Sequence, residues 1–294
     1  QLIEEDKVFA IIGPSTSGET MKIKNIAEQT ETILISCAAA EVIVNPVAKW
    51  VFKTPQMDSD AVKKIYMEMN RLNIAKIAVV AGNTGFGKAG KDQLLQIAPE
   101  FGIEVVISEV YDKDATDLSA VVAKLTANKD IQAVVNWSIV PAQSIIIKNI
   151  RQAGWDVPIF QSHGFGNIKF VQAAGDAAEG TIFPAGRLLV ADVLPDDHPQ
   201  KEVLVKYKND YESRFKEDVS TFGGHAYDAF MILVQAIAEA GLDKAKVRDA
   251  IENMKGFVGT GGIFNFSPED HTGLGLDGFE LITVKDGQFV LYEN

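Results

Sequence analysis

Residues 9–40 read FAIIGPSTSGETMKIKNIAEQTETILISCAAA, and this stretch decides the fold class. The apolar run at 8–12 stops at the Gly-Pro pair 13–14, as expected for a short buried strand. The three hydroxyl residues at 15–17 then stand where a helix would begin. A second apolar run follows at 32–36, so the stretch predicts strand, helix and strand, the repeating unit of a parallel α/β sheet.

The same stretch contains a candidate anion site. Ser15 and Ser17 fall at the expected helix start and Thr20 in its first turn, where hydroxyls and free backbone N–H groups attract an anion. After the second strand the side chains are small enough for a ligand to approach the backbone. An ordinary strand–helix–strand unit with a capping hydroxyl explains the stretch equally well. The alternative that we carry forward is a carboxylate-binding crevice at the strand ends that also includes Ala38, Ala39 and Ala40.

Strands and helices alternate through the rest of the first half. Short apolar runs rich in valine, isoleucine and alanine precede stretches with amphipathic helical spacing, which is typical of parallel sheets covered on both faces. We expect strands at 76–81, 104–110, 133–137 and 158–161, and helices at 58–72, from the glycine-rich loop 82–90 to about residue 101, and at 117–127 and 141–153.

The second half has longer helices and a β-rich end. We expect helices at 199–216, 224–240 and 244–254, followed by strands within 261–294. Asp286-Gly287 between two apolar runs indicates a hairpin. The whole pattern predicts an α/β protein with doubly wound, parallel-rich sheets.

Composition limits the possible functions. The 294 residues are enough for two domains, and a hydrophobic content of 47% is typical of a globular protein with a sizeable core. A formal net charge of -12 argues against a nucleic-acid partner, which requires a basic face. The four histidines are far apart and there is one cysteine, Cys37, so we expect no metal site and no internal disulfide.

The start of the chain carries its own expectations. Residues 1–7 look like the tail of a helix, and no initiator methionine, signal peptide or membrane-spanning run is present in the sequence. We expect a mature, processed or truncated soluble protein whose sequence begins within a domain.

No catalytic constellation is apparent, because no serine lies in a GxSxG elbow and the loop GNTGFGKAG at 82–90 matches neither nucleotide-binding fingerprint. Phe86 in this loop is either exposed to a ligand or folded back on its own domain. The strand ends carry hydroxyls, small residues and aromatic groups, which favours binding of a small organic anion over chemistry. Besides the residues already named, these candidates are Phe86, Trp137, Ile139, His163 and Phe222.

Several segments together carry a family resemblance. They are IIGPSTSGETM, ILISCAAA, TGFGKAG, AVVNWSIVPAQSIIIKNIRQAGWDVPIFQSHG, AAGDAAEG and FGGHAYDAFMIL. In this order, and over essentially the whole chain, the sequence resembles the substrate-binding proteins of branched-chain amino acid ABC transporters, which have the periplasmic binding protein type I fold. The resemblance implies two Rossmann-like lobes joined by three crossovers, with the ligand in the cleft between them.

The resemblance also implies lobe boundaries: residues 1–57 with 187–276 in one lobe, and 58–186 with 277–294 in the other. Relatives have a strand–helix–strand unit before the position of Gln1, so we expect either that this sequence is a fragment or that the unit was lost.

The resemblance assigns roles to single residues. Ser17 matches the hydroxyl that binds the ligand carboxylate, and the backbones at Ala38 and Ala40 match the lining of the same pocket. Phe86 matches a tyrosine that closes over the ligand, and Phe222 matches an aromatic wall.

The chain departs from the family at four positions, one of which is Phe86 in place of the tyrosine. Amino acid binders have a threonine at Ala40, a tyrosine at Ile139 and, at His163, a glutamate that neutralises the ligand ammonium. Because a buried ammonium without a carboxylate partner is costly, we expect a carboxylate ligand with an apolar or aromatic body and no required ammonium.

The predicted function is therefore a non-enzymatic solute receptor of an ABC importer. We expect the ligand to be a hydrophobic amino acid or an aromatic or aliphatic acid, the partners to be permease subunits, the location to be periplasmic or extracellular, and no cofactor to be needed. The alternatives are a ligand-sensing domain of a receptor or amide-type regulator, and an α/β enzyme that uses Ser17 or Cys37.

Overall fold

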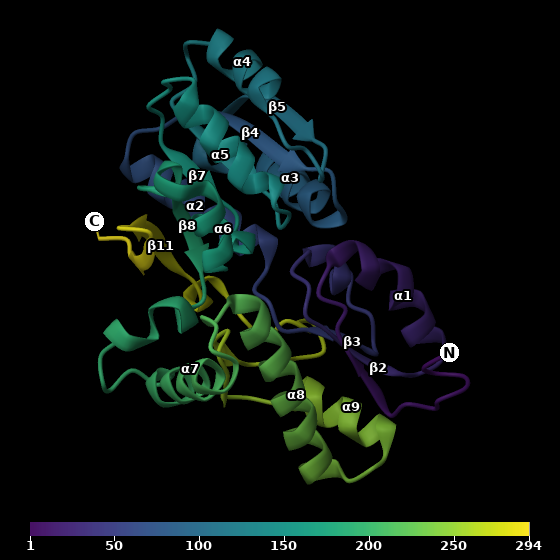
Figure 1. The fold of residues 1–294 in the computed structure, drawn as a ribbon. Helices are drawn as coiled ribbons and strands as arrows, with labels where there is room; N and C mark the ends of the chain where they lie inside the picture. The colour runs from purple at the N-terminus through teal and green to yellow at the C-terminus, as the bar shows by residue number, and fades with distance from the viewer. Residues whose placement is uncertain (294) are drawn as a thin grey trace. The chain divides into compact units, whose positions relative to one another are not determined.

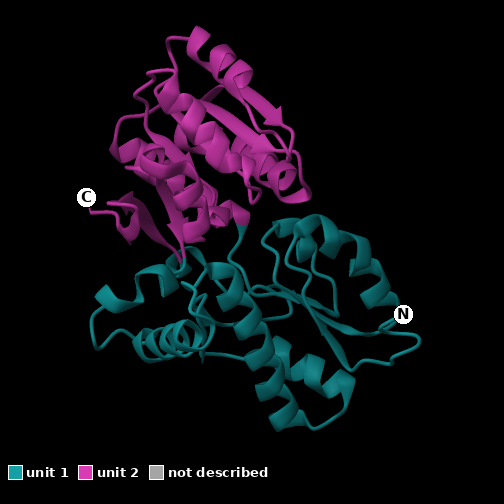
Figure 2. Cartoon of the chain, viewed as in Figure 1, with its two compact units in different colours: residues 1–57, 186–278 teal, residues 58–185, 279–294 magenta. Residues whose placement is uncertain are grey.

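The computed structural model describes residues 1–293, which form two compact units (Figures 1 and 2). Unit 1 comprises Gln1–Met57 and Gly186–Gly278, and unit 2 comprises Asp58–Ala185 and Phe279–Asn294. The chain therefore passes from one unit to the other three times. Each unit is described by itself below.

Unit 1 contains a parallel sheet in the order β1-β2-β3, in which Ile12 is paired with Ile35, and Ile35 with Phe52. Helices α8 and α9 pack against each other, as Figure 1 shows. The elements of unit 1 are β1 (Ala10–Ile12), α1 (Ser17–Gln29), β2 (Ile33–Ser36), η1 (Glu41–Ile43), β3 (Val51–Lys53), η5 (Arg187–Val193), α7 (Lys201–Phe215), α8 (Thr221–Ala240), α9 (Lys244–Asn253), β9 (Phe257–Val258), β10 (Ile263–Phe264) and η6 (Leu276–Gly278).

The core of unit 1 joins the two separate stretches of chain that form it. Ile33, Ile35 and Phe52 from the sheet are fully buried together with apolar residues of α8, α9 and β10. The Phe52 ring stacks on the His271 ring at a centroid distance of 4.1 Å. Burial of these apolar surfaces against the second stretch is what stabilises so small a sheet.

Unit 2 contains a seven-stranded sheet in the order β12-β11-β8-β7-β6-β4-β5. Strands β4 to β8 pair in parallel, whereas β11 pairs antiparallel with β8 and β12. The elements are α2 (Asp58–Arg71), β4 (Lys76–Gly82), α3 (Gly85–Ile97), η2 (Ala98–Phe101), β5 (Glu104–Tyr111), α4 (Ser119–Ala127), β6 (Ala133–Trp137), α5 (Ala142–Gln152), β7 (Ile159–Gln161), η3 (His163–Phe165), α6 (Ile168–Ala174), η4 (Gly175–Ala178), β8 (Ile182–Ala185), β11 (Glu280–Lys285) and β12 (Gln288–Leu291).

The strand order of unit 2 fixes where a ligand can approach. From β4 the chain winds outward to β5 through α3, and it then returns past β4 to β6 and continues through β7 to β8. Right-handed crossovers therefore place α3 on one face and α4, α5 and α6 on the other. The winding reverses between β4 and β6, and the carboxyl ends of strands at such a switch point are where α/β sheets bind ligands.

The predicted fold class is confirmed, and most predicted elements lie within a few residues of the observed ones. Three local predictions are wrong. Residues 2–5 form a turn rather than a helical tail, with the Glu5 N–H donating to the Gln1 carbonyl at 2.8 Å. Most of the glycine-rich loop belongs to α3, whose start is capped by the Thr84 hydroxyl accepting from Gly87 N at 3.0 Å. Phe222 lies inside the first turn of α8 rather than before it.

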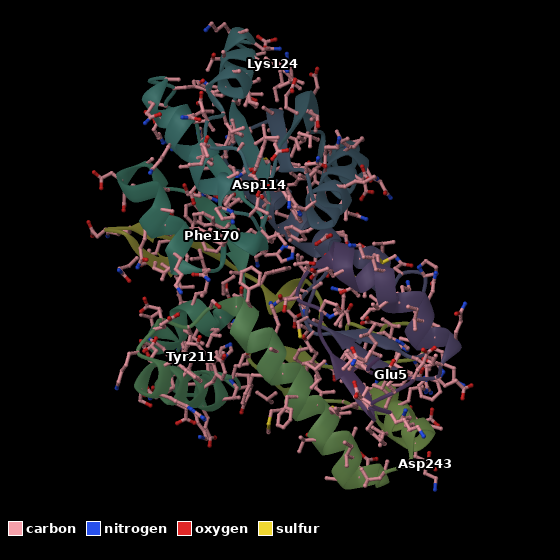
Figure 3. The ribbon with its side chains drawn as sticks, turned by 45° about the vertical axis from the view of Figure 1, so that its right-hand side comes forward. Glu5, Asp114, Lys124, Phe170, Tyr211 and Asp243 are labelled. Carbon is pink, nitrogen blue, oxygen red and sulfur yellow. The ribbon has the colours of Figure 1, made fainter. Side chains whose placement is uncertain are left out.

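Both units carry exposed acidic side chains. Glu5 and Asp243 on unit 1 and Asp114 on unit 2 are exposed (Figure 3). Within residues 1–293, no helix combines the length and apolar character needed to cross a membrane.

Candidate functional site

Unit 1 brings Ser17 together with the small-residue loop that follows β2. Ser17 is the first residue of α1 and is buried, and its hydroxyl oxygen accepts a hydrogen bond from the Ala40 N–H at 3.2 Å. The loop is held from within by the Ala38 N–H, which donates to the Ser36 hydroxyl at 3.1 Å. We call Ser17, Ala38, Ala39 and Ala40 the unit 1 cluster. The Ser17 hydroxyl oxygen already accepts a hydrogen bond from Ala40, so the same hydroxyl still has its O–H to donate to an anion.

The other predicted residues of unit 1 lie differently. The Thr20 hydroxyl is fully buried, donates to the Thr16 carbonyl at 3.1 Å and lies 2.9 Å from the Ser36 hydroxyl, so its bonds join α1 to β2. Ser15 is exposed, and Phe222 is half-buried at the start of α8. Thr20 therefore has a structural role: it bonds to the Ser36 hydroxyl, which in turn holds the loop that contains Ala38.

Unit 2 gathers Phe86, Trp137 and His163 from the carboxyl ends of β4, β6 and β7. The His163 ring lies edge-to-face against Phe86 at 5.3 Å and against Trp137 at 5.5 Å between centroids. All three side chains are buried. Phe86 is thus folded onto its own unit, the second of the two possibilities left open by the sequence. The cluster lies at the switch point of the sheet, the position that favours ligand binding.

Asp58 is the member of this cluster that the sequence did not indicate. It is the first residue of α2 and fully buried, and its Oδ1 lies 3.6 Å from His163 Nε2. The Asp58 carboxylate and the His163 imidazole therefore lie within ion-pair distance of each other. We call Asp58, Phe86, Trp137, Ile139 and His163 the unit 2 cluster.

Ile139 is half-buried and lies close to Gly164, the residue that follows His163. A Cβ added at the neighbouring Gly164 would come within 2.5 Å of Ile139 Cγ2 and 3.1 Å of Phe86 Cε1. Glycine at this position therefore allows the turn after β7 to approach the other members of the cluster.

The Trp137 indole also packs against α3. A Cβ added at Gly90 would lie 1.9 Å from Trp137 Nε1, so the helix can reach the indole only because residue 90 has no side chain. We expect Gly90→Ala to lower the free energy of unfolding by about 1–3 kcal/mol, because overpacking outweighs the gain in helix propensity of about 1 kcal/mol. Urea denaturation followed by circular dichroism measures this difference.

The matched control is Gly223→Ala in α8, where the nearest atom to the new Cβ would be the hydroxyl at the tip of Tyr207, at 2.7 Å. We expect this variant to keep the wild-type stability to within about 1 kcal/mol. Equal effects of the two substitutions would contradict close packing of Trp137 on α3.

The chemistry of the two clusters suits binding. The Cys37 thiol is buried, and burial raises its pKa to about 11, so it is protonated and a poor nucleophile at neutral pH. Among residues 1–293, no group of three or more histidine, cysteine or acidic side chains could hold a metal ion. What remains is a hydroxyl with neighbouring backbone N–H groups in unit 1, and an aromatic cluster with a histidine–aspartate pair in unit 2.

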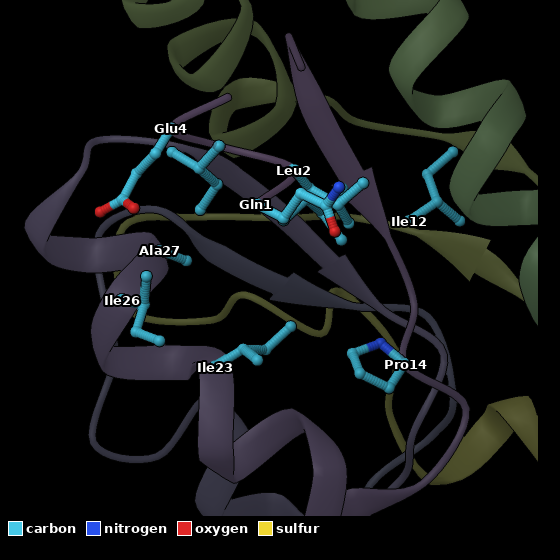
Figure 4. Close-up of a pocket in the computed structure, with 10 residues that line it drawn as sticks. Gln1, Leu2, Glu4, Ile12, Pro14, Ile23, Ile26 and Ala27 are labelled. Atoms are coloured by element: carbon cyan, nitrogen blue, oxygen red, sulfur yellow. The ribbon is translucent and has the colours of Figure 1, made fainter. Parts of the chain in front are cut away.

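A separate hollow of about 480 Å³ lies in unit 1 between residues 1–4, β1 and α1 (Figure 4). Its walls are mainly apolar side chains, including Leu2, Ile12, Ile23 and Ile26. These residues belong to neither cluster, so the hollow is not the predicted carboxylate site.

Gln56 in unit 1 lies close to the point where the chain first leaves this unit, and the sequence did not indicate its contacts. Its buried side-chain amide donates to the carbonyls of Gly261 at 2.7 Å and Gly278 at 3.2 Å. A Cβ at Gly186 would lie 3.2 Å from the same amide nitrogen. The three segments at which the chain leaves or enters unit 1 therefore meet around one side chain.

Comparison with known proteins identifies the family. The family model described as periplasmic binding protein matches residues 1–288. The chain belongs to the periplasmic binding protein family. Curated relatives of this periplasmic binding protein include the leucine-, isoleucine-, valine-, threonine- and alanine-binding protein of Pseudomonas aeruginosa, 24% identical over 85% of the chain. The Leu/Ile/Val-binding protein homolog 1 of Brucella melitensis is 26% identical over 80% of it. The chain spans 65% and 61% of the lengths of these two relatives.

Solved structures establish the type I fold of this periplasmic binding protein. An extracellular ligand-binding receptor from Rhodopseudomonas palustris HaA2 has a TM-score of 0.93 and 27% identity, covering 99% of this chain and 84% of that one. The leucine-binding protein LivK of Thermotoga maritima has a TM-score of 0.86 at 20% identity, covering 99% and 81% of the two chains. The fold is that of the LivK-like type I periplasmic binding proteins.

Proposed function

We propose that this protein is the solute receptor of an ABC importer and that it binds a small carboxylate with an apolar body. The observation that carries the proposal is the pairing of Ser17 with Ala40, which leaves a hydroxyl donor at a helix start beside a loop without bulky side chains. Hydroxyl and N–H donors at a helix N-terminus suit a carboxylate. The relatives named for branched-chain amino acids support the same class of ligand.

In this proposal the unit 2 cluster receives the other end of the ligand. Half-buried Ile139 provides apolar surface, Phe86 packs against the His163 ring within the unit, and His163 provides a ring nitrogen that can donate to a ligand oxygen. Since the Asp58 carboxylate already faces His163, we propose that the site does not require a ligand ammonium. Closure of the two units around the ligand, followed by delivery to a membrane permease in the periplasm or at the cell exterior, completes the proposed role.

Ligand-induced thermal stabilisation tests the proposal. The compounds are leucine, isoleucine and valine, together with isocaproate and phenylacetate, which have similar bodies and no ammonium. A ligand at a hundred times its Kd stabilises the native state by about 2.7 kcal/mol, which gives a clear rise in Tm. We expect isocaproate or phenylacetate to raise the Tm. A rise with the amino acids alone would overturn the ligand class, and no rise with any compound would overturn the receptor role.

A further inference from the structure

Lys53, the last residue of β3, is fully buried in unit 1, and its Nζ donates three hydrogen bonds to backbone carbonyls. The acceptors are the oxygens of Ala39 at 3.0 Å, Pro55 at 2.7 Å and Gln56 at 3.0 Å. An ammonium has three N–H donors, whereas a neutral amine has two, so this geometry fits the charged form.

One of these bonds leads directly to the unit 1 cluster. The carbonyl of Ala39 and the N–H of Ala40 belong to the same peptide group, and that N–H donates to the Ser17 hydroxyl at 3.2 Å. A cation on the carbonyl oxygen draws electron density from the peptide and makes its N–H a stronger donor. A hydroxyl that accepts a stronger bond becomes a better donor itself, because hydrogen bonds in a chain polarise one another.

We propose that Lys53 is a positioning residue of the carboxylate site, whose ammonium strengthens the hydrogen bond from Ser17 to the ligand through the Ala39–Ala40 peptide. This inference rests on the proposed function, because it assumes that Ser17 holds a carboxylate. It adds a buried positive charge, placed behind the loop, to a site whose other donors are neutral. Lys53 does not touch the ligand in this arrangement.

The chain contains a matched control for the purely structural role of such a lysine. Lys201, in the same unit, also donates to three backbone carbonyls, those of Ala191 at 3.1 Å, Asp192 at 2.8 Å and Leu194 at 2.9 Å. Its acceptors belong to η5 and the residue that follows it, away from the Ala39–Ala40 peptide. Loss of Lys201 therefore removes the same kind of carbonyl cap without weakening the bond to Ser17.

The test compares each acid with its own primary amide, which has nearly the same shape and no charge. The probes are leucine with leucinamide, isocaproate with isocaproamide, and phenylacetate with phenylacetamide, measured by calorimetry on the whole chain. The variants are Lys53→Met and Lys53→Gln, both of which remove the charge, while the second retains N–H donors. We expect both to weaken binding of the acid about tenfold, which corresponds to about 1.4 kcal/mol. Binding of the amide should change less than about twofold, because the loss of charge assistance is felt mainly by an anion.

Each outcome decides the inference. An unchanged ratio of acid to amide affinity in the Lys53 variants, or an equal change in Lys201→Met, would overturn it while the proposed function stands. If the wild type binds none of the acids, the proposed function fails and the inference with it.

A measurement on the wild type covers the case in which the Lys53 variants do not fold. In the ¹⁵N-labelled protein, the acid should shift the Ala40 amide resonance and the amide compound should shift it less. Equal shifts with the two compounds would contradict the proposed effect of Lys53 through the Ala39–Ala40 peptide.

Discussion

Replacing Asp228 with alanine is expected to lower the free energy of unfolding by about 2–6 kcal/mol. The fully buried Asp228 carboxylate accepts from Thr260 N at 2.7 Å, Thr260 Oγ1 at 3.1 Å and Gly261 N at 2.7 Å. Alanine leaves two buried backbone N–H groups without their acceptor, and each costs about 1–3 kcal/mol. Urea denaturation followed by circular dichroism measures the loss.

An exposed aspartate provides the control. Asp210 in α7 pairs with Lys206 at 2.5 Å in solvent, and we expect Asp210→Ala to change stability by less than about 1 kcal/mol. If the two substitutions had the same effect, Asp228 would not hold the segment around Gly261 that accepts the Gln56 amide.

Asp228 and its neighbour His225 also give the protein a defined response to pH. Burial raises the pKa of Asp228 to about 7, whereas it is about 3.9 in an unfolded chain. Between these values the native state binds more protons than the unfolded state, so this group's contribution to stability falls as pH rises. Burial, followed by the charge of Lys53, lowers the pKa of His225 to about 3. Its unfolded value is about 6.5, so its contribution rises with pH.

The two slopes oppose each other in the wild type between about pH 4 and 6.5. Asp228→Ala removes the contribution that falls with pH and leaves that of His225. We therefore expect the free energy of unfolding of this variant to rise more steeply between about pH 4 and 6.5 than that of the wild type. Denaturation at several pH values measures both curves, and parallel curves would contradict the assignment.

Replacing Ser17 with alanine is expected to weaken binding of the carboxylate ligand by about tenfold to a hundredfold. A hydrogen bond to a charged group is worth about 1.5–3 kcal/mol, and every 1.4 kcal/mol is about a factor of ten in Kd. The variant also loses the acceptor for the Ala40 N–H, which further loosens the loop. Calorimetry with the acid that stabilises the wild type most strongly gives the change in Kd.

Ser119→Ala is the matched control, because Ser119 is the first residue of α4 as Ser17 is of α1, and it is exposed. We expect its Kd to equal that of the wild type. Wild-type affinity in Ser17→Ala would show that the carboxylate is bound elsewhere.

Most helices and strands could be predicted from the sequence because the patterns that indicate them lie within a few neighbouring residues. The run at 76–81 has the composition of a buried strand, and β4 spans Lys76–Gly82. The glycines at 82–90 favoured a loop, but Thr84 caps a helix there, and a cap depends on backbone geometry that glycine content does not reveal. The start of α8 was misplaced for the same reason: the Ser220 hydroxyl accepts from Gly223 N, and this local hydrogen bond begins the helix earlier than the composition indicates.

The clusters were only partly accessible from the sequence. Ser17 stands at a helix start and Ala40 after the end of a strand, where the pattern alone indicates a site, and the structure joins them by a hydrogen bond. No local signal in the sequence marks Lys53, because only the tertiary fold places three carbonyls around its ammonium. The sequence predicts Asp58 only as the first residue of a helix. Its proximity to His163 depends on the order of the strands in the sheet, which cannot be predicted from neighbouring residues.

The division of unit 1 into Gln1–Met57 and Gly186–Gly278 has a consequence for synthesis on the ribosome. Strands β2 and β3 emerge early, but the helices and β10 that bury Ile33 and Phe52 are translated only after strands β4 to β8. Those strands belong to one uninterrupted stretch and can form a sheet as they emerge. Most of the second unit is therefore synthesised before the segments that cover β2 and β3. During that interval the apolar side chains of β2 and β3 stay uncovered, so we expect a chaperone to act on this segment first.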